Sequence, residues 1–294
     1  MKKVALIIHG HRSLSKSSTD TIDLLENSES LRISQLKTTC VGDAINLAKM
    51  ACADYDVIVA VGGDGTCNEV INGIMLAEPK EMQLGIIPNG TGNDFVRNLD
   101  GFSAESFVHK LTTGTGKKID VGKISFKASD RYFLNVADIG FGAKVVETMS
   151  RQRTKGLGGK ASYSLAILRT FFSYKKSVIL ARGGSIEFKG KALMLVFSNG
   201  ATFGHGLKVF PDAKIDSGEL GLVVIGNVSL YEYVKNLRNL KKGRKINHPE
   251  VHYHTFKRLV LESGEGVHAE TDGEIAGKSS ISVEVIPNAL FLIC

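Results

Sequence analysis

The chain has 294 residues, of which 43% are hydrophobic and 23% are charged, a composition typical of a globular protein with one or two domains. The first apolar stretch, Val4–Ile8, is too short for a signal peptide, and no run approaches the roughly 18 apolar residues of a membrane-spanning helix. Cys40, Cys52, Cys67 and Cys294 show no paired spacing, so a reducing cytoplasm fits better than a disulfide framework. The composition therefore argues against a disordered chain, a disulfide scaffold and an integral membrane protein.

The net charge of +7 is concentrated in the second part of the chain. Residues 1–120 contain 12 Lys and Arg against 15 Asp and Glu, whereas residues 121–294 contain 25 against 15. A basic second part would assist action on a substrate in an anionic bilayer, although a general charge that aids solubility explains it equally well. Nucleic-acid binding is not expected, because the chain shows neither a recognised module nor an interleaving of basic and aromatic residues.

In residues 1–120, strand-like and helix-like stretches alternate, which predicts a mainly parallel sheet with helices on its faces. Val57–Val61 is a β-branched run of strand length, and a helix-like stretch follows it over Asn68–Met75. Leu84–Ile87 repeats this plan, with a second helix expected to begin at Asp94. Ligands of such sheets bind beyond the carboxyl ends of the strands, and therefore at the turns that follow these two strands.

Both turns are rich in glycine. They read Gly62-Gly63-Asp64-Gly65-Thr66 and Asn89-Gly90-Thr91-Gly92-Asn93-Asp94. Glycine tolerates positive φ and lets backbone N–H groups close on a polyphosphate, and a helix that begins just beyond adds its positive dipole end. Asp64 would repel such a ligand unless a cation or a reacting hydroxyl lay between them. The paired turns therefore predict Mg²⁺-assisted phosphoryl transfer rather than nucleotide storage.

After residue 120 the pattern changes to short strands, which predicts a largely antiparallel β-sandwich with helical insertions. The expected strands are Tyr132–Ala137, Ser177–Ala181, Ala192–Ser198, Gly221–Val224, Lys257–Glu262 and Ser280–Ile286. Helices are expected over Lys160–Tyr174 and Leu230–Lys241, and each is followed by lysines. Two interpretations remain open: the helices cap the sandwich, or they form a membrane-facing entrance to a lipid site.

These motifs together resemble the bacterial diacylglycerol kinases and related lipid kinases, whose eukaryotic relatives include sphingosine and ceramide kinases. The resemblance spans nearly the whole chain. It rests on the two glycine turns and on three further segments, Lys118-Ile119-Asp120-Val121-Gly122, Lys214-Ile215-Asp216-Ser217-Gly218 and Asp272-Gly273-Glu274.

For the fold, the resemblance implies a first domain over residues 1–120, similar to those of phosphofructokinases and NAD kinases, which binds the nucleotide. It implies a β-sandwich substrate domain over residues 121–287. A tail at about 288–294 is expected to return to the first domain.

The resemblance also implies roles for individual residues. Glu274 is the expected general base, and Asp64 would orient the catalytic Mg²⁺ or the acceptor hydroxyl. Asp94, Arg97 and Asp120 would complete the network. The residues expected to hold the nucleotide are Gly62, Gly63, Gly65, Thr66, Asn68, Gly90, Thr91, Gly92 and Arg12.

Two positions need separate mention. Asp216 matches the aspartate that holds a second, structural Mg²⁺ in similar kinases, although a plain turn is the alternative. The family usually shows Asn-Pro-x-Ser-Gly after the first strand, whereas this chain has His9-Gly10-His11-Arg12-Ser13. Arg12 could still reach a phosphate there, and Ser13 a ribose.

The resulting hypothesis is an ATP-dependent lipid kinase that phosphorylates the hydroxyl of diacylglycerol or a comparable membrane lipid. It would be cytoplasmic and peripherally associated with the inner face of the membrane, with a homodimer left open. Two alternatives are a kinase of a soluble acceptor such as NAD and a non-catalytic nucleotide- or lipid-binding regulator. The first ranks low because Asn68-Glu69 lies two residues beyond the turn, whereas NAD kinases carry their Asn-Glu pair on a separate segment.

Overall fold

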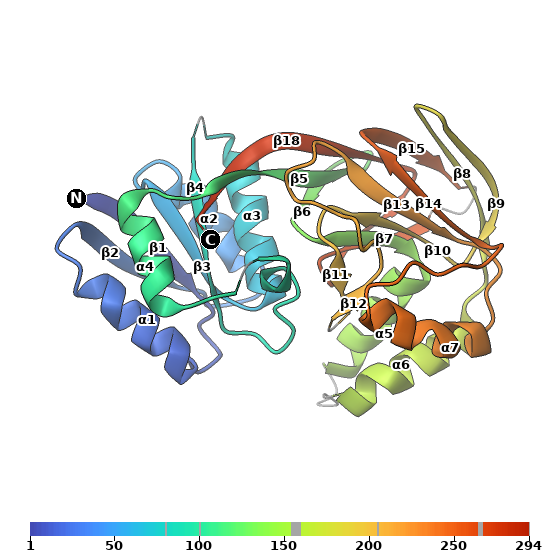
Figure 1. Ribbon diagram of the computed structural model, residues 1–294, viewed down its shortest axis with the longest axis horizontal. Coiled ribbons are helices and arrows are strands. Elements are labelled where there is room, and N and C mark those ends of the chain that lie inside the picture. Colours follow the sequence, from blue (N-terminus) through green and yellow to red (C-terminus); the bar gives the residue numbers. More distant parts are fainter. Residues whose placement is uncertain (80, 100, 154–159, 205, 264–266, 294) are drawn as a thin grey trace.

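The computed structural model describes residues 1–79, 81–99, 101–153, 160–204, 206–263 and 267–293, and it has two lobes connected by long strands (Figure 1). The first lobe is built on a parallel sheet in the order β2-β1-β3-β4. Its strands are β1 (Lys2–Ile8), β2 (Leu31–Lys37), β3 (Val57–Gly62) and β4 (Gln83–Pro88). Every residue of β3 is buried, as an unbroken apolar run predicts for the middle of a parallel sheet.

Helices cover both faces of this sheet (Figure 1). They are α1 (Lys16–Glu26) and α4 (Ala104–Thr113) on one face, and α2 (Asp43–Ala51) and α3 (Asp64–Ala77) on the other. Ile22 and Phe107 fill the core on the first face, and Ala48 and Ile71 fill the core on the second. The sheet is thus fixed from both sides, and the turns that follow β3 and β4 open at its carboxyl edge.

The sheet continues beyond β4 through β18 (Ile281–Ile293). Phe291–Ile293 pair in parallel with Gln83–Gly85 of β4, and β18 also pairs antiparallel with β5 (Lys117–Ser125) and β15 (Arg258–Glu262). The remaining strands of this sheet are β6 (Asp130–Phe133), β8 (Ser177–Gly183) and β9 (Ile186–Ala192). Within the described residues it has ten strands and runs through both lobes.

A second, antiparallel sheet completes the second lobe as a sandwich. In spatial order its strands are β14 (Val251–Phe256), β13 (Leu220–Ile225), β10 (Met194–Ser198), β7 (Val136–Gly140), β16 (Val267–Thr271) and β17 (Glu274–Ser279). Ile124 and Phe133 of the first sheet pack against Phe197 and Leu222 of the second. A separate small hairpin is formed by β11 (Thr202–Phe203) and β12 (Leu207–Lys208).

In the described part of the second lobe there are three helices: α5 (Phe141–Arg153), α6 (Lys160–Ser173) and α7 (Leu230–Lys241). Phe141 of α5 and Ala166 of α6 join the core formed by the outer face of the second sheet. In α7, Ser229 and Glu232 form a capping box, which explains why the helix begins where the sequence predicts. None of the helices in the described ranges combines the length and hydropathy needed to cross a bilayer.

The predicted fold class is confirmed, but several elements differ from prediction. α3 begins at Asp64 instead of Asn68, so Asp64, Gly65 and Thr66 form its first turn. The second glycine turn is followed by a 3₁₀ turn, η1 (Val96–Asn98), in place of the expected helix. In η1, Arg97 donates to the carbonyl oxygen of Gly92, and Asn98 accepts the N–H of Ala201 in the second lobe. Within the described residues, the α-helix expected to begin at Asp94 is therefore not formed. The expected strand Tyr132–Ala137 is divided into β6 and β7, because the backbone between them turns to donate three N–H groups to Asp272.

Candidate active site

The two glycine turns touch each other. They follow the neighbouring parallel strands β3 and β4, and the backbone N–H of Asn89 donates to the Gly62 carbonyl oxygen at 2.7 Å. A Cβ at Gly63 would lie 3.0 Å from the Gly90 Cα, so the backbones are packed as closely as glycine allows. This contact places the two sets of backbone N–H groups at one edge of the sheet, where one polyphosphate can meet both.

Side chains of the first turn face inward. Thr66 is buried, and its side chain fills the space that a Cβ at Gly62 would need. Asn68 is also buried and donates to the Tyr132 carbonyl oxygen and to Asp272 Oδ2, at 3.1 and 3.0 Å. Asn68 therefore connects α3 of the first lobe to the turn that carries Glu274.

The second turn is more open. Thr91 is exposed and accepts a hydrogen bond from Arg12 Nη2 at 2.9 Å, so Arg12 lies at the mouth of the two turns. Gly90 and Asn93 close the loop by reciprocal hydrogen bonds of 3.0 Å. The Gly92 carbonyl oxygen accepts from Arg97 Nε at 3.1 Å.

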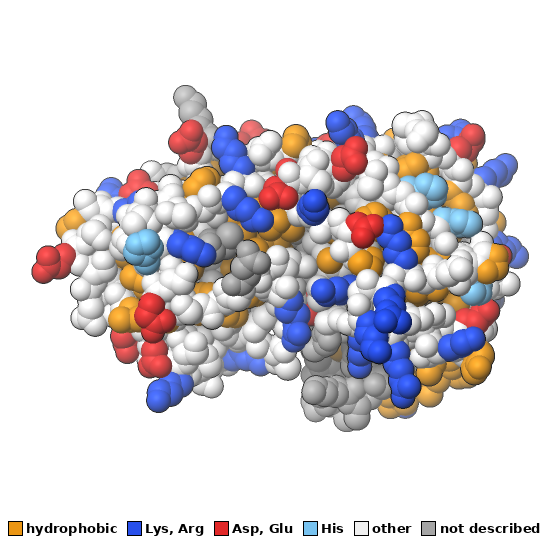
Figure 2. Space-filling model, viewed as in Figure 1, with side chains coloured by type: hydrophobic (Ala, Val, Ile, Leu, Met, Phe, Trp, Pro, Cys, Tyr) orange, Lys and Arg blue, Asp and Glu red, His pale blue; other side chains and the backbone are white. Residues whose placement is uncertain are grey.

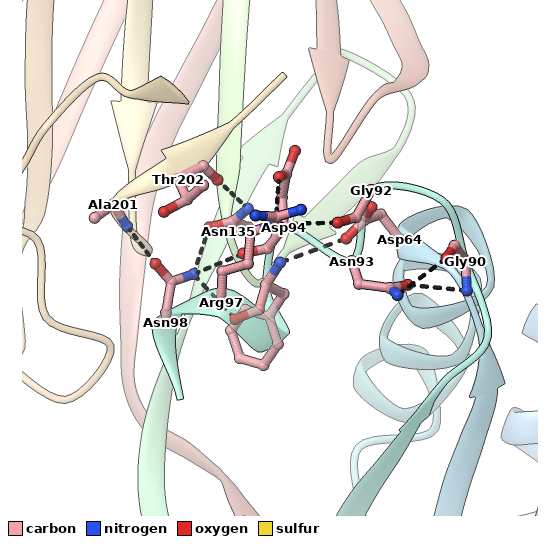
Figure 3. A network of polar contacts seen from close by, with 11 residues as sticks. Asp64, Gly90, Gly92, Asn93, Asp94, Arg97, Asn98, Asn135, Ala201 and Thr202 are labelled. Atoms are coloured by element: carbon pink, nitrogen blue, oxygen red, sulfur yellow. Dashed lines mark hydrogen bonds and ion pairs between the residues drawn. The ribbon is translucent and has the colours of Figure 1, made fainter. Parts of the chain in front are cut away.

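Asp64 and Asp94 place two carboxylates beside the turns (Figure 3). Burial and the negative charge of Asp94 raise the pKa of the Asp64 carboxyl, and backbone N–H groups of the second turn partly oppose this shift. Arg97 forms an ion pair with Asp94 at 3.5 Å (Nε–Oδ1). The Asp64–Asp94 repulsion favours a ligand that brings positive charge.

The residues present therefore suit a magnesium ion held jointly by protein and nucleotide. Within the described ranges, no group of three or more His, Cys, Asp or Glu side chains forms a complete metal site. Mg²⁺ in phosphoryl-transfer sites is usually held by one or two carboxylates together with water and substrate phosphates. Asp64 and Asp94 are the carboxylates that would supply the protein's share.

Glu274 reaches the first turn from the second lobe. It begins β17 directly after the Asp272-Gly273 turn, and a Cβ at Gly65 would lie 2.8 Å from Glu274 Oε1. Asp272 fixes this turn, because its carboxylate accepts the N–H groups of Leu134, Asn135 and Val136 at 3.0 to 3.1 Å. Burial nevertheless raises the pKa of Asp272 to about 6. The exposed carboxylate of Glu274 is thus presented to the glycine turns by an anchored loop.

Asp120 and Asp216 lie apart from this group. Asp120 is buried on β5, and its carboxylate accepts the N–H groups of Gly218 and Asn288 at 2.6 and 2.9 Å. Asp216 is exposed and pairs with Lys117 Nζ at 3.3 Å. Asp120 therefore holds the Lys214–Gly218 loop through hydrogen bonds. A role for Asp216 as a ligand of a second Mg²⁺ stays a prediction.

An amide network that the sequence analysis did not identify joins the lobes (Figure 3). Asn98 donates to Asn135 Oδ1 at 3.0 Å and accepts the N–H of Ala201 at 3.1 Å, and Asn135 donates to the Thr202 carbonyl oxygen. Isolated asparagines carry no spacing signal, so only the fold reveals this contact. It anchors the segment of Asp94 and Arg97 to the second lobe.

A shallow depression of about 790 Å³ lies over β8, β15 and β18. Val178, Leu180, Val260 and Ile281 are among the residues that line it. The predicted catalytic residues are not among them, so this depression is separate from the glycine turns.

Comparisons with known proteins agree along the whole chain. The diacylglycerol kinase catalytic domain matches residues 3–124, and the YegS C-terminal NAD kinase beta sandwich-like domain matches residues 135–294. A protein named diacylglycerol kinase from Staphylococcus saprophyticus is 32% identical over 285 residues, which cover 95% of this chain and 91% of that protein. One from Staphylococcus haemolyticus is 33% identical, with coverages of 95% and 84%.

Solved structures establish the fold. A crystal structure of a diacylglycerol kinase from Bacillus anthracis matches with a TM-score of 0.71 and 21% identity, over 99% of this chain and 96% of that one. Another structure from the same organism gives a TM-score of 0.79 at 24% identity, over 99% and 97%.

Proposed function

The chain belongs to the diacylglycerol kinase catalytic domain family, and on that premise we propose that it transfers the γ-phosphate of ATP to the hydroxyl of diacylglycerol or a similar membrane lipid. The observation that supports this most strongly is the approach of Glu274 to Gly65, since it brings a carboxylate of one lobe against a phosphate-binding turn of the other. The reaction would then take place between the lobes.

The proposed mechanism uses these groups as follows. Backbone N–H groups of the two touching turns bind the phosphates, with Arg12 at their mouth. Glu274 accepts the proton of the lipid hydroxyl while the hydroxyl oxygen forms a bond to the γ-phosphorus of ATP. The bond between the γ-phosphorus and the oxygen that bridges it to the β-phosphate breaks, and ADP is released. Asp64 and Asp94 would hold Mg²⁺, which when bound neutralises charge on the transferring phosphate.

The direct test is transfer of labelled γ-phosphate from ATP with Mg²⁺ into micelles that contain diacylglycerol, phosphatidylglycerol or sphingosine. We expect label in one lipid and a loss of about 10²-fold or more in kcat for Glu274→Gln and Asp64→Asn. Glu262→Gln is the matched control, because Glu262 is an exposed carboxylate on β15 of the same lobe. Near-normal activity of Glu274→Gln would refute the role of Glu274 as the base. If NAD, offered as the acceptor in a parallel reaction, were labelled and no lipid were, the lipid acceptor would be refuted.

We also propose that the second lobe contacts the membrane peripherally, through the outer surfaces of α6 and α7. These helices lie at the same end of that lobe (Figure 1). Their large exposed apolar side chains are spaced three or four residues apart, so that those of one helix share a face. They are Leu165, Leu168 and Phe172 on α6, which are 43, 43 and 77% exposed, and Tyr231 and Val234 on α7, which are 74 and 55% exposed. We call these five residues the α6–α7 face.

Basic residues border the α6–α7 face. Lys175 and Lys176 follow α6, and Lys241, Lys242 and Arg244 lie at the end of α7. In Figure 2, Lys and Arg side chains gather on this lobe next to hydrophobic side chains at its edge. Exposed apolar side chains beside cations suit the surface of an anionic bilayer, where both contribute to binding.

Vesicle co-sedimentation tests this proposal. We expect the wild type to bind phosphatidylglycerol vesicles more strongly than phosphatidylcholine vesicles, and Phe172→Ser to lose most of that binding. Val178→Ser, which removes a 51% exposed apolar side chain from β8, should bind like the wild type. Equal binding by both variants would refute the assignment of the α6–α7 face.

A further inference from the structure

Two acidic side chains are buried side by side behind the turn of Glu274. Asp138 on β7 and Glu270 on β16 are directly opposite each other in the strand register, and they are only 2 and 4% exposed. Their carboxyl groups hydrogen-bond to each other, and in the part of the chain that the structure describes no ion pair joins either to a cation. Gly142 makes room for this pair, because a Cβ there would overlap the Asp138 carboxyl.

Two touching, buried carboxyl groups cannot both be ionised at neutral pH, so they hold one proton between them. Asp138 is the ionised member, because its Oδ1 accepts the N–H of Ala143 at 2.8 Å in the first turn of α5, where negative charge is favoured. Glu270 keeps the proton and donates it to Asp138. Burial and the Asp138 charge raise the pKa of Glu270 well above its ordinary range, and burial raises that of Asp138 to about 6.

The pair is connected to the proposed base through the backbone. Glu270 accepts the N–H of Gly273 at 2.6 Å, and Gly273 is the residue before Glu274. Two sets of hydrogen bonds thus hold the Asp272-Gly273 turn. Asp272 accepts N–H groups of the connection between β6 and β7, and Glu270, which lies against Asp138 of β7, accepts the N–H of Gly273.

We propose that Asp138 and Glu270 form a one-proton lock that positions the Glu274 turn, and that loss of this proton releases the turn and lowers activity at alkaline pH. The positioning role rests on the proposed function of Glu274, whereas the shared proton does not. Deprotonation would leave two adjacent buried carboxylates, and their repulsion would separate Glu270 from the Gly273 N–H.

Other titratable groups face this pair and stay the same in the variants proposed below. Asp272 adds negative charge near Glu270. Burial, together with the negative charge of the nearby Asp138, raises the pKa of Tyr174 to about 12. On the same side of β16, His268 Nδ1 is 3.8 Å from Glu147 Oε2 of α5, and the Glu147 carboxylate pairs with Lys144 and Arg151. Lys278 of β17 is opposite His268 in the register.

Glu270→Gln tests the lock, because its amide can donate to Asp138 and accept from Gly273 but carries no titrating proton. We expect its kcat at pH 7 to stay within about twofold of the wild type, while the alkaline decline moves to higher pH by at least about one unit. Glu270→Ala leaves the Gly273 N–H without this acceptor and should lower kcat about tenfold or more, with the KM for ATP little changed. Glu262→Gln serves again as the control and should keep the wild-type pH profile.

Thermal unfolding against pH gives a readout that does not depend on catalysis. A carboxyl group whose pKa is raised in the folded protein adds stability below its unfolded pKa and loses it as pH rises through the folded value. Relative to the wild type, Glu270→Gln should therefore gain in Tm between pH 5 and pH 9. Parallel Tm profiles would overturn the shared proton, and a normal kcat for Glu270→Ala would overturn the positioning role. If Glu274→Gln proved active, the proposed role of Glu274 as the base would fail, yet the Tm profiles would still decide whether Asp138 and Glu270 share a proton.

Discussion

The contact between the two glycine turns makes a graded prediction at Gly63 and Gly90. A Cβ at Gly90 would lie 2.5 Å from Asn93 Oδ1 and closer still to the Gly63 Cα, whereas a Cβ at Gly63 would lie 3.0 Å from the Gly90 Cα. The Gly90→Ala clash is mainly with backbone, which cannot rotate away, so the turns must separate by about 1 Å to restore ordinary contact. Overpacking of this kind costs about 1 to 3 kcal/mol.

Displacement of a binding group by about 1 Å can reduce the rate about 10²-fold, equivalent to about 2.7 kcal/mol in activation free energy. We expect Gly90→Ala to lower kcat/KM for ATP by about that factor, and Gly63→Ala to have a smaller effect. Steady-state kinetics with varied ATP, together with Tm, would measure this. Gly190→Ala on β9 is the control, since its Cβ would lie 3.3 Å from the far end of the Phe188 ring. Gly90→Ala with wild-type kinetics would refute the claim that the touching turns form one phosphate site.

Three further predictions concern single side chains. Asn68→Ala removes the hydrogen bond to Asp272 that joins the lobes and should lower the free energy of unfolding by about 2 kcal/mol in urea titrations; an unchanged midpoint would contradict this. Arg12→Ala should raise the KM for ATP about tenfold with kcat nearly unchanged, and an unaltered KM would remove Arg12 from the site. Hydrogen bonds from Ser229, with a smaller effect of His248, lower the pKa of Glu232 to about 2. The Glu232 carboxylate therefore stabilises the fold above pH 4.5, and this effect is lost as the pH falls toward 2. Glu232→Gln should lower Tm at pH 7 but not at pH 2. Equal Tm shifts at both pH values would contradict the capping role of Glu232.

The sequence predicts well what depends on local pattern. The unbroken apolar run of β3 and the glycines after it predict the strand and the presence of a helix beyond it, although α3 begins at Asp64, four residues before the predicted Asn68. The capping box at Ser229 and Glu232 fixes α7 in the same way. In each case a residue type is required by a local geometry, so neighbouring positions suffice to infer it.

Features that depend on distant segments could not be predicted in this way. Leu134 and Asn135 lie within a run that reads as one strand, and only Asp272, 137 residues beyond Asn135, explains the break. α5 was not predicted, and its N-terminus is held by a buried aspartate of β7. Asp138 and Glu270 look like ordinary surface acids until the register of β7 and β16 places them opposite each other.

The course of β18 has a consequence for how the protein folds during synthesis. Phe291 pairs with Gln83, so 208 residues separate the two sides of this contact. Until β18 has been synthesised, the edge of β4 that it covers has no strand to complete it, and a free edge is prone to pair with other chains. The first lobe therefore cannot complete its sheet as an independent unit while the rest of the chain is being made. We expect a ribosome-bound chain that stops before β18 to depend on chaperones, even though it contains both glycine turns.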